Sequence, residues 1–208
     1  MTVASIAASP DRRGRYRVEF SDGSAMKLPP SVIADLCLYT GRELDESELR
    51  RVREAERKAD AKQRAVNIIS ATTVSGRELS DRLRRKGASE ADAAEAVQWL
   101  QELCLVDDAR TARQIVERGV RRGYGARRIR QILFEKKIPR EYWDEAMEAV
   151  PEPDGAIDDY LRANLRGAPD QKERKRVSDA LVRRGFDWSD ISAGLRRYGA
   201  ELEAMEEE

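Results

Sequence analysis

The chain has 208 residues, and its 39 lysines and arginines balance 39 aspartates and glutamates, so the formal net charge is zero. Charged residues make up 38% of the chain and aromatic residues only 6%, which suits thin cores between amphipathic helices and excludes one thick core. Histidine is absent, which excludes histidine general bases, Ser-His-Asp triads and histidine metal sites. We therefore expect a mostly helical protein that is not an enzyme and has neither a cofactor nor a metal site.

The two cysteines, Cys37 and Cys104, show neither metal-ligand spacing nor a disulfide framework. We expect both to be buried as small apolar side chains in a reducing cytoplasm. The first residues have neither the basic start nor the apolar core of a signal peptide. No stretch approaches the roughly 18 apolar residues that a membrane span needs. These features predict a soluble, cytoplasmic protein.

The first segment, residues 1–60, differs from the rest of the chain. Residues 15–20 (RYRVEF) alternate polar and apolar side chains, and residues 25–28 (AMKL) follow after a turn at Asp22 and Gly23. This pattern predicts a β-hairpin. Since two strands alone are marginally stable, we expect the hairpin to pair with another strand or to pack on a helix. A short helix from Ser31 to near Gly41 and a long linking helix of mixed charge should follow.

The remainder of the chain repeats itself. Residues 77–89, 127–139 and 175–187 align without gaps, at offsets of 50 and 48 residues. Each stretch has apolar residues at i and i+4, which predicts a helix with one buried face. The buried positions include Leu83, Leu133 and Leu181. The three helices should end at Gly87, Lys137 and Gly185, where glycine suits a left-handed C-cap.

Two more helices should flank each of these, which predicts three-helix repeats over residues 61–106, 107–155 and 156–208, the last with an acidic tail. In the first repeat, Ser75 and Glu78 form a capping box, and a third helix buries Ala93, Val97, Leu100 and Leu103. The expected fold class is mostly α. Three tandem three-helix repeats form an elongated, curved solenoid, and an N-terminal β-hairpin and linking helix precede them.

The chain resembles the RecX family, regulatory proteins of the bacterial RecA recombinase. The stretches that carry the resemblance are, in order, LYTGRELDESEL, SGRELSDRLRRKG, LVDDARTARQIVERGVRRGYGARRIRQIL and VRRGFDWSDI. Their order and the threefold repeat make the match specific. One position departs from the family's pattern, because Thr111 stands where an aromatic residue is usual. That substitution weakens the packing expected there.

The resemblance implies a regulator of RecA, mainly an inhibitor, with no catalysis of its own. Such a protein binds the filament of RecA on single-stranded DNA and damps its growth, ATP hydrolysis, strand exchange and co-protease activity. The implied partner is that filament, with weak direct contacts to DNA and none to a membrane, and we expect a monomer. The alternative is a stand-alone nucleic-acid-binding protein built from helix-turn-helix-like units. The zero net charge argues against it, since dedicated DNA binders are normally basic overall.

Positive charge is concentrated in the middle of the chain. Residues 110–140 hold eleven basic and two acidic residues, whereas residues 141–160 hold eight acidic residues and no basic one. A helical wheel places Arg127 and Phe134 opposite the apolar face, and the position of Arg127 is also basic at Arg77 and Lys175. A basic residue repeated in this way would form a stripe suited to a helical polymer of repeating charge. The candidate partner- or nucleic-acid-binding residues are Arg77, Arg84, Arg85, Lys86, Arg118, Arg121, Arg122, Tyr124, Arg127, Arg128, Arg130, Phe134, Lys136, Lys137 and Lys175.

The two aromatic candidates each allow two interpretations. Phe134 either packs against the next repeat, which we favour, or contacts a partner or a base. Tyr124 either stacks on a base or fills the turn in which it lies. The basic run itself could be an ordinary solvated face, because arginine stems often cover apolar surface.

Overall fold

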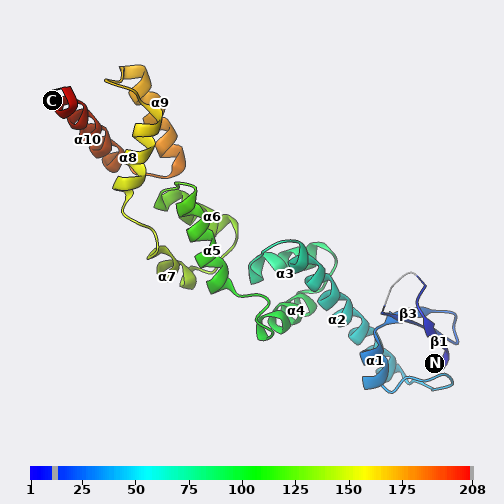
Figure 1. The fold of residues 1–208 in the computed structure, drawn as a ribbon. Coiled ribbons are helices and arrows are strands. Elements are labelled where there is room, and N and C mark those ends of the chain that lie inside the picture. Colours follow the sequence, from blue (N-terminus) through cyan, green and yellow to red (C-terminus); the bar gives the residue numbers. More distant parts are fainter. Residues whose placement is uncertain (11–13, 207–208) are drawn as a thin grey trace. The chain divides into compact units, whose positions relative to one another are not determined.

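The computed structural model describes residues 1–10 and 14–206 (Figure 1). Its elements, in chain order, are β1 (Val3–Ala8), β2 (Tyr16–Phe20), β3 (Ala25–Leu28), α1 (Pro30–Asp35), α2 (Glu46–Ala71), α3 (Gly76–Arg85), α4 (Glu90–Glu102), α5 (Asp108–Arg121), α6 (Ala126–Glu135), the 3-10 helix η1 (Arg140–Tyr142), α7 (Trp143–Met147), α8 (Pro153–Asn164), α9 (Gln171–Arg184) and α10 (Trp188–Glu206). The predicted mostly helical fold class is therefore confirmed. The chain divides into two compact units, residues 1–106 and 107–208. No helix among the described residues is long and apolar enough to cross a membrane.

The N-terminal sheet is antiparallel, with strand order β1-β2-β3. The predicted hairpin is present as β2 and β3, and its expected further partner is β1, which pairs Ile6 with Val18. The sheet packs on the first turns of α2 through Leu49 and Val52. Buried Arg15 fastens this contact, since its guanidinium donates to the Ala59 carbonyl at 3.2 Å and forms an ion pair with Asp60 at 3.1 Å.

Three separate helical cores follow the sheet. The first joins α2, α3 and α4, the second joins α5, α6 and α7, and the third joins α8, α9 and α10. The aligned positions Leu83, Leu133 and Leu181 are fully buried, one in each core. The repeated i, i+4 pattern therefore identified the inward face of all three middle helices.

The ends of the middle helices also follow the prediction. Gly87, Lys137 and Gly185 have φ angles of +89°, +55° and +92°, so each helix stops at a left-handed residue. Lys137 shows that the position demands this conformation even when a side chain opposes it. At the other end of α3, the Ser75 hydroxyl accepts the Glu78 N–H at 3.1 Å, which is the N-cap half of the predicted capping box. The Glu78 carboxylate instead contacts Arg82 at 2.5 Å.

Three predictions about residues near helix ends were wrong. Both cysteines are exposed, because Cys37 and Cys104 adopt left-handed φ angles of 49° and 54° directly after a helix. Leu103 is exposed as well, since it is the C-cap of α4 rather than part of its inner face. The first helix ends at Asp35 instead of continuing towards Gly41, and the chain takes a left-handed turn at Cys37. Position in the terminal turn, and not side-chain polarity, decides exposure at these sites.

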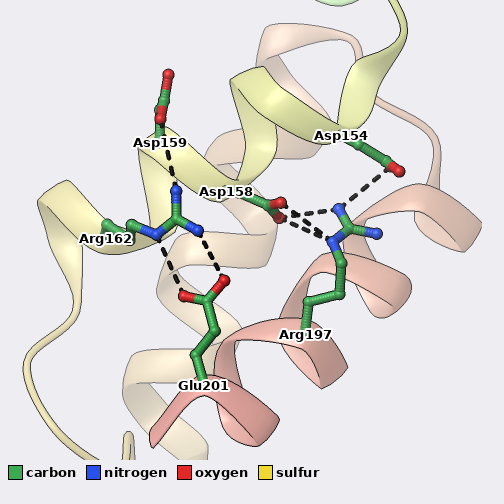
Figure 2. A network of polar contacts seen from close by, with 6 residues as sticks. All are labelled: Asp154, Asp158, Asp159, Arg162, Arg197 and Glu201. Atoms are coloured by element: carbon green, nitrogen blue, oxygen red, sulfur yellow. Dashed lines mark hydrogen bonds and ion pairs between the residues drawn. The ribbon is translucent and has the colours of Figure 1, made fainter. Parts of the chain in front are cut away.

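Two arginine-centred networks join α8 and α10 in the third core (Figure 2). Arg197 of α10 contacts Asp158 at 2.8 Å and Asp154 at 3.2 Å. Arg162 of α8 contacts Glu201 at 2.7 Å and Asp159 at 3.8 Å. These ion pairs lie beside the apolar contacts of Ile157, Leu161 and Ile191. Ion pairs therefore border the third core, which contains few apolar residues.

Candidate partner-binding surface

The basic segment forms two packed helices, α5 and α6. Asp107 caps α5 by accepting the Arg110 N–H at 2.8 Å. On its inner face, α5 buries Ala112 and Val116, and α6 buries Ile129 and Leu133. Because these apolar positions take the inward face of both helices, the arginines between them are left on the outside.

A glycine lets the two helices approach closely. A Cβ atom at Gly119 would lie only 2.7 Å from Cγ1 of Ile129, so a larger residue would force the helices apart. Gly119 is itself buried, whereas Arg118, Arg121 and Arg122 around it are exposed. At the α5 end of the candidate surface, the Gly119 backbone thus packs directly on the Ile129 side chain of α6.

The arginines of α6 differ in solvent exposure. Arg127 and Arg130 are exposed, whereas Arg128 is half-buried. Arg127 has a loose ion pair with Asp187, with 3.7 Å between Nη1 and Oδ1, and Arg128 has one with Glu135 at 3.7 Å. In the part of the chain that the structure describes, Arg118, Arg121 and Arg130 form no ion pair. Much of the positive charge on these two helices is therefore free to meet an external group.

The favoured packing of Phe134 against the next repeat is wrong. Its side chain is 67% exposed, and Val182 at the aligned position of α9 is 37% exposed. The third helical core reaches α6 only near its start, where the Gly125 N–H donates to the Arg184 carbonyl at 2.9 Å. Because the far end of α6 has no such neighbour, Phe134 remains on the surface beside the arginines.

Tyr124 is half-buried and packs against the core of α5, α6 and α7. Its N–H donates to the Gly119 carbonyl at 3.0 Å, which closes the turn after α5. Gly123 before it has a φ angle of +65° and ends the helix. These contacts favour the interpretation in which Tyr124 fills the turn over one in which it stacks on a base.

The remaining candidates lie at three other places. Lys136 and Lys137 are exposed at the C-terminal end of α6, and Lys175 is exposed on α9. Arg77 is exposed on α3, where Arg84 pairs with Asp81 and the Nε of Arg85 donates to the Asp81 carbonyl at 3.4 Å. The Lys86 carbonyl accepts a hydrogen bond from Arg64 at 2.6 Å. The four candidates near α3 belong to residues 1–106, whereas all the others belong to the second compact unit.

Sequence reasoning missed an exposed aromatic residue close to the candidate surface. Trp188 begins α10 with its side chain 63% exposed, directly after the Asp187 that pairs with Arg127. The first turns of α9 are also exposed throughout, and they carry Lys172, Arg174 and Arg176 as well as Lys175. The stretch QKERKR is a visible signal for the basic turns, whereas no pattern distinguishes Trp188 from a core tryptophan.

Acidic residues are exposed on two other helices of the same compact unit, α7 and α8. Asp144, Glu145 and Glu148 are exposed on or beside α7, and Asp154 and Asp159 are exposed on α8. The Glu141 carboxylate raises the pKa of the Tyr142 hydroxyl by accepting its hydrogen bond. An ion pair of 3.1 Å between Arg113 and Glu145 joins the basic α5 to the acidic α7. The charge segregation that the sequence indicates is thus present on the surface.

A family model, related sequences and solved structures all match this chain. Residues 107–147 match the family model described as RecX, second three-helix domain. A regulatory protein RecX from Vibrio parahaemolyticus is 32% identical over 143 residues, which cover 65% of this chain and 89% of that protein. One from Levilactobacillus brevis is 28% identical over 193 residues, which cover 90% of this chain and 73% of that protein.

Two solved structures share the fold. A crystal structure of regulatory protein RecX matches with a TM-score of 0.71 at 22% identity, and the match covers 94% of this chain and 98% of that one. The crystal structure of RecX from Lactobacillus salivarius matches with a TM-score of 0.62 at 18% identity, over 72% of this chain and 99% of that one. These structural matches show the shared fold, and the 32% identity to the Vibrio parahaemolyticus protein over 89% of its length shows that the chain belongs to the RecX family of regulatory proteins.

Proposed function

We propose that this chain regulates the RecA recombinase, mainly as an inhibitor. It binds the filament of RecA on single-stranded DNA and damps filament growth, ATP hydrolysis, strand exchange and co-protease activity. The observation that carries the proposal is the exposed basic surface of α5 and α6 in a member of the RecX family. The chain acts by occupying the filament and not by catalysis.

The charge arrangement supports a docking role. Arg118, Arg121 and Arg130 have no ion pair within the described residues, so docking need not first break internal contacts. Exposed charges of this kind steer association and set its rate. An exposed Phe134 among them adds apolar contact area, which a purely solvated charged face would lack.

The second candidate function is direct binding to nucleic acid without RecA. The basic turns of α9 and the exposed Trp188 favour it, since single strands are held by cationic grooves and aromatic stacking. Binding to single strands that neutralises Z phosphates weakens with salt at a slope of about −0.7Z. A dedicated DNA binder should show this slope strongly by itself. A filament regulator should bind bare DNA weakly and bind DNA tightly once RecA covers it.

The deciding experiment is a titration of the ATPase of RecA stimulated by single-stranded DNA, with DNA binding measured in parallel without RecA. We expect strong inhibition below one molecule per RecA and weak binding to bare DNA over a range of salt concentrations. Full ATPase activity at equimolar protein would rule the proposal out. Tight, steeply salt-dependent binding to bare DNA with no effect on RecA would establish the second candidate instead.

Charge reversal on α6 tests the surface itself. Arg127→Glu with Arg130→Glu should leave the free energy of unfolding within about 0.5 kcal/mol of the parent, because both side chains are exposed. It should reduce inhibition of the RecA ATPase. The matched control is Arg50→Glu with Arg53→Glu, which reverses two exposed arginines of α2. Unchanged inhibition by the α6 variant, or equal loss in the control, would show that α6 is not the docking surface.

A further inference from the structure

A pocket lies in the second compact unit, away from the exposed face of α6 that carries Arg130 and Phe134. It has a volume of about 160 Å³. Its walls come from the turn between α5 and α6, the segment that leads into α8, and the connection from α9 to α10. The second and third helical cores therefore meet around it.

Two glycines fix the geometry of this pocket. A Cβ atom at Gly125 would lie 2.5 Å from the carbonyl oxygen of Gly185, and one at Gly185 would lie 2.3 Å from the backbone nitrogen of Arg128. The Arg127 N–H donates to the Gly185 carbonyl at 3.3 Å. The start of α6 and the end of α9 thus touch backbone to backbone. The pocket is built into this contact and is not a chance gap between side chains.

The lining and the size indicate a single long side chain as the occupant. The apolar part of the wall comes from Val120, Tyr124, Val150, Pro151, Pro153, Ala156 and Phe186. The volume corresponds to roughly five water molecules, whereas small-molecule and cofactor sites usually occupy about 300–1,000 Å³. A nucleotide is therefore too large, but the aliphatic stem of one residue fits.

The charges around the pocket select a cation. Its charged lining residues are Glu152, Asp187 and Asp190, and the lining includes no lysine or arginine. The starts of α6, α8 and α10 also meet here, and each contributes about half a positive charge. Arg127 offsets one of the three carboxylates, Asp187, at 3.7 Å. Among the described residues, Glu152 and Asp190 have no basic partner, and their two negative charges still outweigh the dipoles, so the lining favours a cation over an anion.

The carboxylates are only partly committed within the chain. Glu152 is the N-cap residue of α8 but makes no side-chain capping hydrogen bond. Among the described residues, the Asp187 carboxylate has one ion pair, the loose and exposed contact with Arg127 at 3.7 Å. Arg184 reaches the rim of the pocket, where its Nη1 lies 3.5 Å from the Gly123 carbonyl oxygen. It is held there by its own contacts, because the same nitrogen donates to the Arg122 carbonyl at 3.0 Å and the guanidinium lies 4.9 Å from the centre of the Tyr160 ring. Negative charge at the pocket therefore remains available to an external cation.

We propose that this pocket receives the side chain of one arginine or lysine presented by a partner protein. The aliphatic stem packs against Tyr124, Val150 and Phe186, and the cationic end lies among Glu152, Asp187 and Asp190. Long basic side chains suit such a site because their stems are apolar and only their ends are charged. The site borders the basic docking surface at the contact between Arg127 and Asp187, but its own charge is the opposite.

The test uses the whole chain and two short peptides, acetyl-Gly-Arg-Gly-amide and its citrulline counterpart, which has nearly the same shape without the charge. Amide shifts of the isotope-labelled protein are followed by NMR during each titration. We expect the arginine peptide to shift the amides of Gly123, Gly125, Ala156 and Gly185 in a saturable way. The citrulline peptide should bind about fivefold more weakly, as expected for a partly exposed charge contact.

A pair of variants locates the binding. Glu152→Gln with Asp190→Asn removes two of the pocket carboxylates and should weaken the arginine peptide to the level of citrulline. The control Asp144→Asn with Glu148→Gln removes two exposed carboxylates of α7 and its end, and it should bind like the parent. Equal binding of both peptides, shifts elsewhere in the protein, or equal weakening in both variants would overturn the proposal. No RecA is present, so the result is independent of the function proposed above.

Discussion

Leu133 and Phe134 are adjacent on α6 but have opposite environments. Leu133 is fully buried, whereas Phe134 is 67% exposed. Leu133→Ala should lower the free energy of unfolding by about 2–5 kcal/mol, because it leaves a cavity. Phe134→Ala should change it by no more than about 0.5 kcal/mol and should weaken inhibition of RecA. Urea unfolding and the RecA ATPase measure the two effects. A strongly destabilised Phe134→Ala would mean that this side chain packs internally after all.

A second prediction at the residue scale concerns Gly125, because the atoms next to it cannot move aside easily. An added Cβ would meet Gly185 and the Phe186 nitrogen at 2.5–2.8 Å, and all of these atoms are backbone. Gly125→Ala should therefore cost about 1–3 kcal/mol of stability. Gly155→Ala is the control, because nothing lies within 4 Å of its added Cβ and the residue is inside α8. The free energy of unfolding of Gly155→Ala should instead rise by about 0.5–1 kcal/mol. Equal effects of the two changes on urea unfolding would contradict the close approach.

At the scale of elements, charge joins α2 to α4. Glu95 of α4 contacts Lys58 of α2 at 2.8 Å and Lys62 at 3.1 Å. The hydrogen bond from Lys58 holds the pKa of the Glu95 carboxyl below its ordinary value, against the opposing effect of burial. A carboxyl whose pKa is lower in the folded state stabilises the fold above its unfolded-state pKa. That stabilisation disappears as the pH falls through the folded-state pKa.

Glu95→Gln should therefore destabilise the protein only where Glu95 is ionised. At pH 7 the loss should be about 0.2–1 kcal/mol, since the side chain is more than a third exposed and solvent screens the pairs. The loss should disappear in acid, at a pH below the lowered folded-state pKa of Glu95, because the parent carboxyl is protonated there as well. Unfolding free energies of both proteins at the two pH values measure this difference. Glu117→Gln, an exposed change on α5, serves as the control, and a loss that persists in acid would contradict the ion-pair explanation.

The elements that the sequence predicted are those whose pattern is local. The helices of the repeats and the β2–β3 hairpin follow from periodicity and from the Asp22-Gly23 turn. Strand β1 was not identified, because only Val3 of its residues is buried and the strand is defined by pairing with β2. The exposure of Cys37 and Cys104 likewise depends on left-handed backbone after a helix. Neither property can be seen in side-chain polarity.

The same distinction applies to the candidate surface. The outward direction of Arg127, Arg130 and Phe134 follows from the wheel of a single helix. The pair between Arg127 and Asp187 joins residues of different helical cores, so no local pattern could reveal it. The prediction that Phe134 packs against the next repeat was wrong for the same reason. A helical wheel shows which way a side chain points but not whether a neighbouring element contacts it. Tertiary contacts decide which of the predicted basic residues remain free.

At the scale of the whole molecule, a net charge of zero conceals two compact units with different surface chemistry. Residues 107–208 contain the basic α5 and α6, the acidic α7 and α8, and the pocket with its carboxylates. Residues 1–106 contain the other basic candidates, Arg77, Arg84, Arg85 and Lys86. A regulator that contacts a polymer through two linked units gains affinity because the second contact forms at a high effective concentration.

Separating the units should therefore weaken regulation more than any single substitution. Residues 107–206 should fold alone, because their two helical cores are formed within the unit, and circular dichroism with urea unfolding would show it. The folded fragment should still bind the RecA filament, but about 100-fold more weakly than the whole chain. Adding residues 1–106 as a separate fragment should not restore inhibition, since the gain requires a covalent link. Full inhibition by residues 107–206 alone would show instead that the second unit contains the entire docking surface.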